Sequence, residues 1–301
     1  MKKIVIDNEL YVGDRLDKSL SLMLPEYSRS KIQTLIDEGV ILVNEKQSKA
    51  SYKLEENDVI TIGDYKEEEQ HFEAENIPLD IVYEDEYLLV INKPRGLVTH
   101  PGAGNKNHTL VNALKFHSEN LSSINGEYRL GIVHRLDKDT AGLMVVAKDD
   151  QTHLFLANQL KDHTLGRTYI ALVKGVITEE EGQIIAPIGR DKQNRLKMAV
   201  DLTHGKEAIT NFKVLKRFHD TTLVECSLLT GRTHQIRVHM TYIGHPIIGD
   251  PLYGKDNRKL YKEGQLLFAY KISFNHPKDK KRREFEVSLP DYFNNVLTSL
   301  H

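Results

Sequence analysis

Three short stretches place charged side chains inside sequence that favours buried strands, so they are the first candidates for chemistry. In GIVHRLDKDTAGLMVVAK (131–148), Asp137 lies between two apolar runs, and Arg135 precedes it by two residues. A plain turn would more often use glycine or asparagine. An aspartate beside basic residues is commonly a turn or cap partner. In a half-buried turn, however, a nearby arginine also favours the ionised carboxylate that a nucleophile requires.

The second stretch, GRTYIALVKG (166–175), places Tyr169 early in an apolar strand. Packing into the core is the ordinary role of an aromatic residue at such a position. A functional role is also available, because the ring can stack on a base and the hydroxyl can handle a proton. This stretch alone leaves both roles open.

The third stretch, LLTGRTHQIRVHM (228–240), has a glycine that breaks a strand and Thr233, which we expect to cap the following helix. Two histidines five residues apart do not share the i, i+4 spacing of a helical zinc site, so we expect no metal. Five hydrogen-bonding side chains within eight residues indicate a cluster that faces a substrate. They are Arg232, His234, Gln235, Arg237 and His239.

A strand-rich region that begins near residue 79 must position these stretches. Strands outnumber helices there and often follow one another directly, which predicts an α+β domain with a mixed, largely antiparallel sheet. Strands are expected over 79–94, 143–148, 168–175, 208–218, 222–231 and 284–290, and helices over 108–117, 151–163 and 233–244.

Residues 1–63 have the pattern of a small α-rich domain. Apolar residues recur at helical spacing over 16–24, and a second helix is expected after a Ser28 cap. Short strands are expected over 40–44 and 58–62. The helices carry basic side chains that are either simply solvated or available to bind an acidic partner, namely Arg15, Lys18, Arg29 and Lys31.

Charge is unevenly distributed along the 301 residues, although the net charge is only −2. Residues 1–75 hold 10 basic and 17 acidic side chains, whereas the remainder holds 31 basic and 26 acidic ones. Residues 64–76 are too acidic and too poor in apolar side chains to form a core, so we expect a linker there. The second domain then spans 77–301, and its basic balance permits nucleic-acid binding.

Composition also limits the class of protein. No apolar run approaches the length of a membrane span, and the first residues lack the pattern of a signal peptide. Cys226 is the single cysteine, which excludes an internal disulfide and a multi-cysteine metal site. No dinucleotide fingerprint, P-loop or zinc spacing is present. We therefore predict a cytoplasmic protein, and nothing requires more than a monomer.

The three stretches, together with YEDEYLLVINKPRGLVTHPG (83–102), resemble the RluA family of RNA pseudouridine synthases, and most of all its RluD-type branch for the ribosomal large subunit. Residues 15–44 resemble the RNA-binding domain of the ribosomal-protein-S-four type. The resemblance implies a pseudouridine synthase fold and an isomerase that needs no cofactor. Such an enzyme breaks the N1–C1′ bond of a uridine, rotates the uracil and rejoins it through C5.

The resemblance also implies roles for single residues. Asp137 matches the catalytic aspartate, and Tyr169 matches a tyrosine that stacks on the uracil and assists loss of the C5 proton. Arg237 is expected to pair with the aspartate, with Arg232 second for that role. Arg135 is associated with filling the space that a flipped base leaves, although a salt bridge to a nearby acid is an alternative.

The partner implied is structured RNA, most of all large-subunit ribosomal RNA or an assembling particle. The expected contacts to RNA are Arg135, Arg232, His234 and Gln235 in the catalytic domain, and Arg15, Lys18, Arg29 and Lys31 in the first domain. Three alternatives remain open: the same chemistry on tRNA, a non-catalytic RNA-binding or ribosome-assembly factor, and a hydrolase that would need a second carboxylate such as Asp139.

Overall fold

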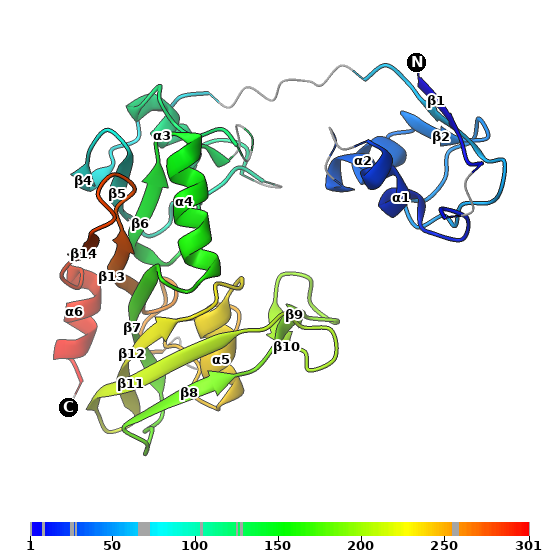
Figure 1. The fold of residues 1–301 in the computed structure, drawn as a ribbon. Coiled ribbons are helices and arrows are strands. Elements are labelled where there is room, and N and C mark those ends of the chain that lie inside the picture. The colour runs from blue at the N-terminus through cyan, green and yellow to red at the C-terminus, as the bar shows by residue number, and fades with distance from the viewer. Residues whose placement is uncertain are drawn as a thin grey trace. The chain divides into compact units, whose positions relative to one another are not determined.

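The computed structural model consists of two compact units, residues 1–70 and 71–301 (Figure 1). The boundary falls inside the segment for which we expect a linker. The structure describes residues 2–7, 10–24, 27, 29–65, 73–102, 105–124, 126, 129–254 and 259–300. Ser28, the expected helix cap, lies outside the described residues.

The first unit combines two helices with a small antiparallel sheet. Its elements are β1 (Lys2–Val5), α1 (Leu16–Met23), α2 (Arg29–Asp37), β2 (Ile41–Val43) and β3 (Val59–Ile62), and the strand order is β1–β3–β2. The apolar positions that predicted the helices are buried together against β2 and β3. The sequence did not reveal β1, which pairs with β3 at the sheet edge.

The described part of the second unit contains the large sheet and four helices. Its elements are β4 (Asp80–Glu84), β5 (Leu88–Lys93), α3 (Leu110–His117), β6 (Ala141–Ala147), α4 (Asp150–Lys161), β7 (Gly166–Lys174), β8 (Glu181–Ile185), β9 (Ile188–Arg190), β10 (Met198–Val200), β11 (Ile209–Arg217), β12 (Thr221–Leu228), α5 (Gln235–Tyr242), β13 (Leu267–Asn275), β14 (Arg282–Glu286) and α6 (Asp291–Thr298). All three expected helices and the expected strands are present, whereas β8, β9, β10, β13 and α6 were not foreseen.

The sheet order is β4–β5–β6–β13–β7–β12–β11–β8, with β14 paired to β13. Only the β6–β13 pair is parallel among the described strands, so the prediction of a mixed, largely antiparallel sheet is confirmed. β13 lies between β6 and β7, which are neighbours in sequence. β13 comes late in the chain and pairs with both strands, so it holds the loop before β6 near the start of β7.

Two helices pack on the sheet near the stretches that carry the candidate residues. α4 packs against β6 and β13, and α5 packs against β10 and β11. Asp149 caps α4 by accepting a hydrogen bond from the Thr152 N–H. β9 and β10 form a hairpin that projects from the main sheet (Figure 1). All seven residues of β6 are buried, which explains why the strand is a continuous apolar run rather than an alternating one.

Gly142 follows the charged loop and allows β6 to approach β13. Its φ is +122°, and a Cβ there would lie 2.2 Å from the Ala269 carbonyl oxygen. We expect Gly142→Ala to lower the free energy of unfolding by about 3 kcal/mol or more, because backbone strain and a backbone clash coincide. Thermal unfolding followed by circular dichroism would measure this. Gly102→Ala is the matched control, since nothing lies within 4 Å of its Cβ position; an equal loss there would contradict the explanation.

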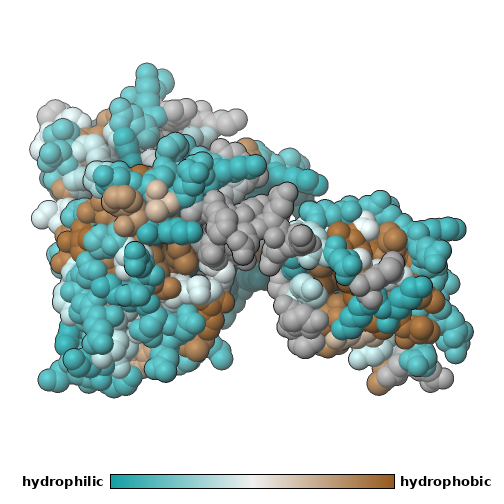
Figure 2. Space-filling model, turned by 90° about the horizontal axis from the view of Figure 1, so that it is seen from above, coloured by the Kyte–Doolittle hydropathy of each residue, from teal (hydrophilic) through white to brown (hydrophobic). Residues whose placement is uncertain are grey.

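Hydrophilic residues cover most of each unit on the face shown in Figure 2. Within the described part of the chain, no helix is both long enough and apolar enough to cross a membrane.

Candidate active site

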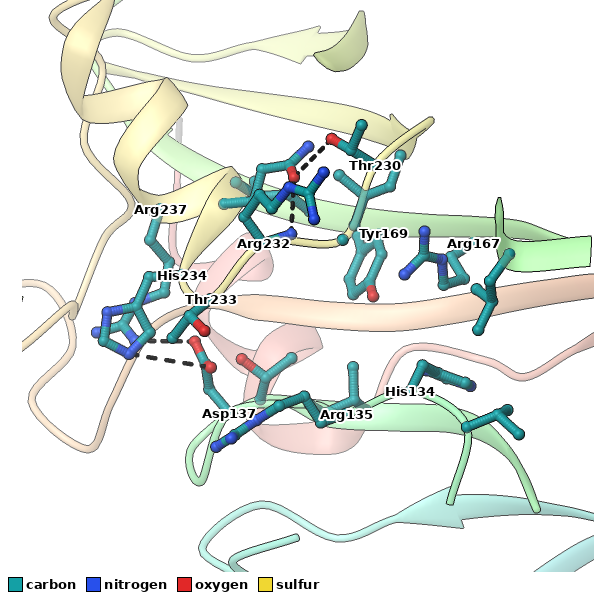
Figure 3. Close-up of a pocket in the computed structure, with 18 of the residues that line it drawn as sticks. His134, Arg135, Asp137, Arg167, Tyr169, Thr230, Arg232, Thr233, His234 and Arg237 are labelled. Carbon is teal, nitrogen blue, oxygen red and sulfur yellow. Dashed lines mark hydrogen bonds and ion pairs between the residues drawn. The ribbon is translucent and has the colours of Figure 1, made fainter. Parts of the chain in front are cut away.

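The three stretches meet around one cavity of about 620 Å³ in the second unit. The loop 131–140, the start of β7 and the turn 228–237 provide most of its walls (Figure 3). Its volume is in the range of small-molecule sites. Positively charged side chains outnumber acidic ones in the lining, as an anionic ligand requires; the cations are Arg129, Arg135, Lys161, Arg167, Arg232 and Arg237.

Asp137 lies on the wall of this cavity, at the start of a tight turn. The Thr140 N–H donates to the Asp137 carbonyl at 3.1 Å, and aspartate is favoured at the first position of such turns. Its side chain is 18% exposed and accepts a hydrogen bond from Arg237 Nη1 at 2.8 Å. The carboxylate is therefore fixed in direction but still open to the cavity.

Arg237 connects two carboxylates. Its Nε and Nη2 donate to the fully buried Asp250 at 2.7 and 3.0 Å, and its Nη1 reaches Asp137. Burial opposes the charge of the guanidinium, but the bonds to Asp250 and Asp137 outweigh it and raise the pKa of Arg237. Between the two candidates for the partner of Asp137, the structure selects Arg237; Arg232 Nε donates instead to the Glu207 carbonyl.

His234 faces the same carboxylate from the turn before α5. Its Nε2 is 3.9 Å from Asp137 Oδ1, and its Nδ1 is 3.0 Å from the Tyr253 hydroxyl. Burial lowers the pKa of His234 although the charge of Asp137 opposes the shift, so the ring is mainly neutral at pH 7. His234 has a left-handed backbone, with φ of +58°, and occupies the position before α5. The expectation that Thr233 caps this helix is wrong.

Tyr169, on β7, faces the cavity from the side opposite Asp137 and is only 5% exposed (Figure 3). Burial raises the pKa of Tyr169, although nearby Arg167 opposes the shift. The phenol is therefore neutral at pH 7 and can offer a ring face and a hydrogen bond to a bound base. The ring packs in the core and also lines the cavity, so its position is compatible with both roles considered from the sequence.

The end of β5, which we did not associate with the site, supports the loop that carries Asp137. The Nζ of Lys93, which is fully buried, donates to the Pro94, Leu97 and Lys138 carbonyls at 2.9, 2.8 and 3.2 Å. Burial lowers the pKa of Lys93 to about 7. The Gly96 N–H also donates to the Lys138 carbonyl. The sequence offered one signal for this supporting role of Lys93: a lysine ends an apolar strand directly before a proline.

Gln235 is placed differently from our expectation of an RNA contact. It is 3% exposed, and its Oε1 accepts from the Thr230 hydroxyl and the Arg232 N–H. Its Nε2 donates to the Ile209 carbonyl and the Thr210 hydroxyl. Both ends of the amide are thus used inside the protein, and Gln235 orders the turn rather than offering free groups to a ligand.

Arg135 is exposed at the cavity mouth near Asp137 (Figure 3). The sequence left open a salt bridge to a neighbouring acid. Among the residues that the structure describes, no carboxylate pairs with Arg135, so its guanidinium is available to a ligand.

In the first unit, a buried carboxylate fixes two of the predicted RNA contacts. Asp17 is fully buried and accepts bonds from Arg15 Nε at 2.9 Å, Arg29 Nη2 at 3.1 Å and Gln33 Nε2 at 2.6 Å. The bond from Arg15 is the main cause that lowers the pKa of Asp17. Both arginine side chains remain 42–49% exposed. They therefore present a fixed pair of cations at the surface.

The other two basic residues of this unit are less constrained. Lys18 Nζ pairs with Asp14 at 3.0 Å on the exposed surface, a contact of the i, i+4 type. Lys31 Nζ lies 4.2 Å from the centre of the Tyr65 ring.

The histidines of the third stretch do not form a metal site in the described structure. The ring nitrogens of His239 bond to the Thr210 hydroxyl and the Ala186 carbonyl at 2.8 and 2.9 Å. Within the described ranges, no group of three or more His, Cys, Asp or Glu side chains could hold a metal ion.

Comparison with known proteins defines the class of protein that this fold and site represent. Residues 87–242 match the family model for RNA pseudouridylate synthases, and residues 14–60 match the S4 domain. The chain belongs to the RNA pseudouridine synthase family and is an isomerase of that class.

Relatives of similar length support the RluD-type branch. The chain is 47% identical to an uncharacterised RNA pseudouridine synthase of Bacillus subtilis, over 96% of this chain and 94% of that one. It is 45% identical to the ribosomal large subunit pseudouridine synthase D of Neisseria meningitidis, over 96% and 79%. A human RNA pseudouridylate synthase domain-containing protein 1 shares the fold with a TM-score of 0.59 and 26% identity, over 73% of this chain and 87% of that one.

Proposed function

We propose that this protein converts specific uridines of large-subunit ribosomal RNA into pseudouridine, with Asp137 as the catalytic carboxylate. The observation that carries the proposal is the Asp137–Arg237 contact at 2.8 Å on the wall of a cavity that Tyr169 also lines. The target RNA is inferred from relatives, several of which are named as ribosomal large subunit pseudouridine synthases. A cytoplasmic location and a monomeric state remain predictions.

The chemistry requires a negative charge beside the ribose. Cleavage of the N1–C1′ bond develops positive charge at C1′, which a carboxylate stabilises as in glycoside hydrolysis. Arg237 orients Asp137, and its own charge is held by Asp250, so that the Asp137 oxygens need not move during the reaction. Three first steps are open to Asp137: attack on the sugar, addition to the uracil and removal of a ribose proton.

Tyr169 is assigned to holding the released uracil. The ring offers a stacking face, and stacking on aromatic side chains stabilises an extruded base. Because the pKa of the phenol is raised, Tyr169 acts first as a hydrogen-bond donor. It can take up the C5 proton only if it passes its own proton onward.

Arg135 suits the role of replacing the flipped uridine in the RNA stem. It is exposed at the mouth of the cavity and pairs with no carboxylate among the described residues. Extrusion of a base costs a few kcal/mol, and a planar guanidinium can recover part of this by stacking.

The hydrolase alternative lacks support at the second carboxylate. Asp139 packs beside Gly264, where a Cβ would lie 2.8 Å from the Asp139 Cβ. Asp139 is not among the described residues that line the cavity. A retaining glycosidase needs two carboxyl groups about 5 Å apart across the bond, so the arrangement favours isomerisation.

The test is carbodiimide primer extension on unmodified large-subunit ribosomal RNA incubated with the protein. We expect discrete stops that name the modified uridines. If stops form only on tRNA, the substrate assignment is wrong and the chemistry stands. If neither RNA is modified, naked or in assembling particles, the non-catalytic binding factor is the better description. Release of free uracil would indicate the hydrolase.

The first unit is proposed to bind RNA phosphates through Arg15 and Arg29. We expect Asp17→Asn to weaken RNA binding by about five- to tenfold, because the two guanidiniums lose the carboxylate that fixes them. Filter binding at several salt concentrations would measure this. Asp14→Asn, which removes only the exposed pair with Lys18, is the control and should change affinity by less than about twofold. Equal effects of the two changes would refute the role of Asp17.

A further inference from the structure

Arg167 is a buried cation in the cavity wall that the proposed reaction does not use. It is 8% exposed, and its guanidinium has neither a hydrogen bond nor an ion pair with any other described residue. Burial lowers the pKa of Arg167. A buried guanidinium without a partner is costly, and structures keep such groups where a ligand supplies the partner.

His134 presents a second buried hydrogen-bond donor beside Arg167. His134 Nε2 accepts the Val145 N–H at 3.2 Å, so the proton of its neutral ring is on Nδ1, which has no hydrogen-bond partner among the residues that the structure describes. Burial, with the charge of Arg167, lowers the pKa of His134 to about 3 and keeps the ring neutral. In Figure 3, Arg167 lies near Tyr169 and His134, on the side away from Asp137. A ligand at this end must therefore offer acceptors.

A second cation lines the same cavity and precedes β7 in the chain. Lys161 ends α4, is exposed and lines the cavity. The ring of His163 bonds to the Leu229 carbonyl, which ties the connection between α4 and β7 to the turn that Arg167 also contacts. Position 231 in that turn must be glycine for Arg167 to keep its place, because a Cβ at Gly231 would lie 2.4 Å from the Nη1 atom of Arg167.

We propose that Arg167 and Lys161 bind a phosphodiester of the RNA next to the target uridine. The inference rests on the proposed function and extends it by naming a phosphate subsite. A phosphate offers only acceptor oxygens and carries negative charge, which matches the buried cation of Arg167 and the unpartnered Nδ1–H of His134. The subsite would hold the backbone while the base turns toward Asp137 and Tyr169.

The experiment uses the hairpin of large-subunit ribosomal RNA that carries the uridine mapped by primer extension. One methylphosphonate is placed at each phosphate flanking that uridine in turn, which removes a single negative charge. For the wild type we expect one position at which affinity falls about tenfold. For Arg167→Met we expect an affinity for unmodified RNA that is about tenfold weaker than that of the wild type. The methylphosphonate at the sensitive position should then lower the affinity of this variant by less than about twofold more.

Three further measurements keep the test decisive if Arg167→Met folds poorly. Lys161→Met changes an exposed residue and should lower the slope of log affinity against log salt by about one. Lys213→Met is an exposed control outside the cavity. With this control, the loss of affinity caused by the methylphosphonate should be as large as with the wild type. Arg167→Lys should keep part of the affinity. Gly231→Ala should resemble Arg167→Met, because its Cβ displaces the guanidinium.

The phosphate subsite is refuted if wild type and Arg167→Met lose the same factor at every methylphosphonate. It is also refuted if Arg167→Met lowers the single-turnover rate at saturating RNA while affinity is unchanged, since Arg167 would then act on the base. Failure of the proposed function looks different: no uridine would be modified in primer extension, and the same methylphosphonate series on a hairpin chosen by wild-type binding alone would still report on Arg167.

Discussion

Asp137→Asn should reduce pseudouridine formation by about 1,000-fold or more while RNA affinity changes by less than about threefold. The amide keeps the shape of the side chain but has neither the nucleophilic oxygen nor the charge that the ribose requires. Stability should be nearly unchanged, because Arg237 retains its two bonds to the buried Asp250. Carbodiimide primer extension and filter binding on the same large-subunit ribosomal RNA would measure both quantities.

Asp139→Asn is the matched control, since it makes the same chemical change two residues further along the same loop. Asp139 packs beside Gly264 and is not among the described cavity residues. We expect it to retain turnover within about tenfold of the wild type. Primer-extension stops of equal strength with wild type and Asp137→Asn would show that Asp137 is not the catalytic carboxylate.

Arg237→Met should have the largest effect on stability and should also abolish most turnover. The change leaves the carboxylate of Asp250 buried without its partner, a loss that typically costs 3–5 kcal/mol. It also releases Asp137, so we expect turnover to fall by about 100-fold or more. Urea unfolding followed by circular dichroism would give the first quantity, and single-turnover assays would give the second. Arg232→Met, which alters an exposed side chain, should change the free energy of unfolding by less than about 1 kcal/mol.

The double variant Arg237→Met with Asp250→Asn separates the two effects. Removing the charge of the abandoned carboxylate should restore part of the lost stability. Turnover should stay low, because Asp137 still lacks its partner. If turnover recovers together with stability, Arg237 acts only through the fold, and its proposed contribution to the chemistry is wrong.

Local patterns in the sequence predicted the parts of the fold that depend on near neighbours in the chain. The apolar spacing of 16–24 and the unbroken apolar run of 143–148 predicted α1 and β6, because burial of a helix face or of both faces of a strand dictates residue types directly. β13 escaped notice, although it occupies the centre of the sheet. Its place between β6 and β7 is a long-range pairing, and no local pattern records which strands are partners.

The site shows the same division. The sequence by itself determined which residue types gather in three stretches, and the family resemblance gave Asp137, Tyr169 and Arg237 their expected roles. Only the tertiary structure decided that Arg237 rather than Arg232 reaches Asp137, that Gln235 turns inward, and that Lys93 supports the loop from another strand. The physical reason is that a side chain's partner is set by the direction of its backbone and by burial. Both depend on contacts between segments far apart in the sequence, as in the Asp137–Arg237 pair, whose members are 100 residues apart.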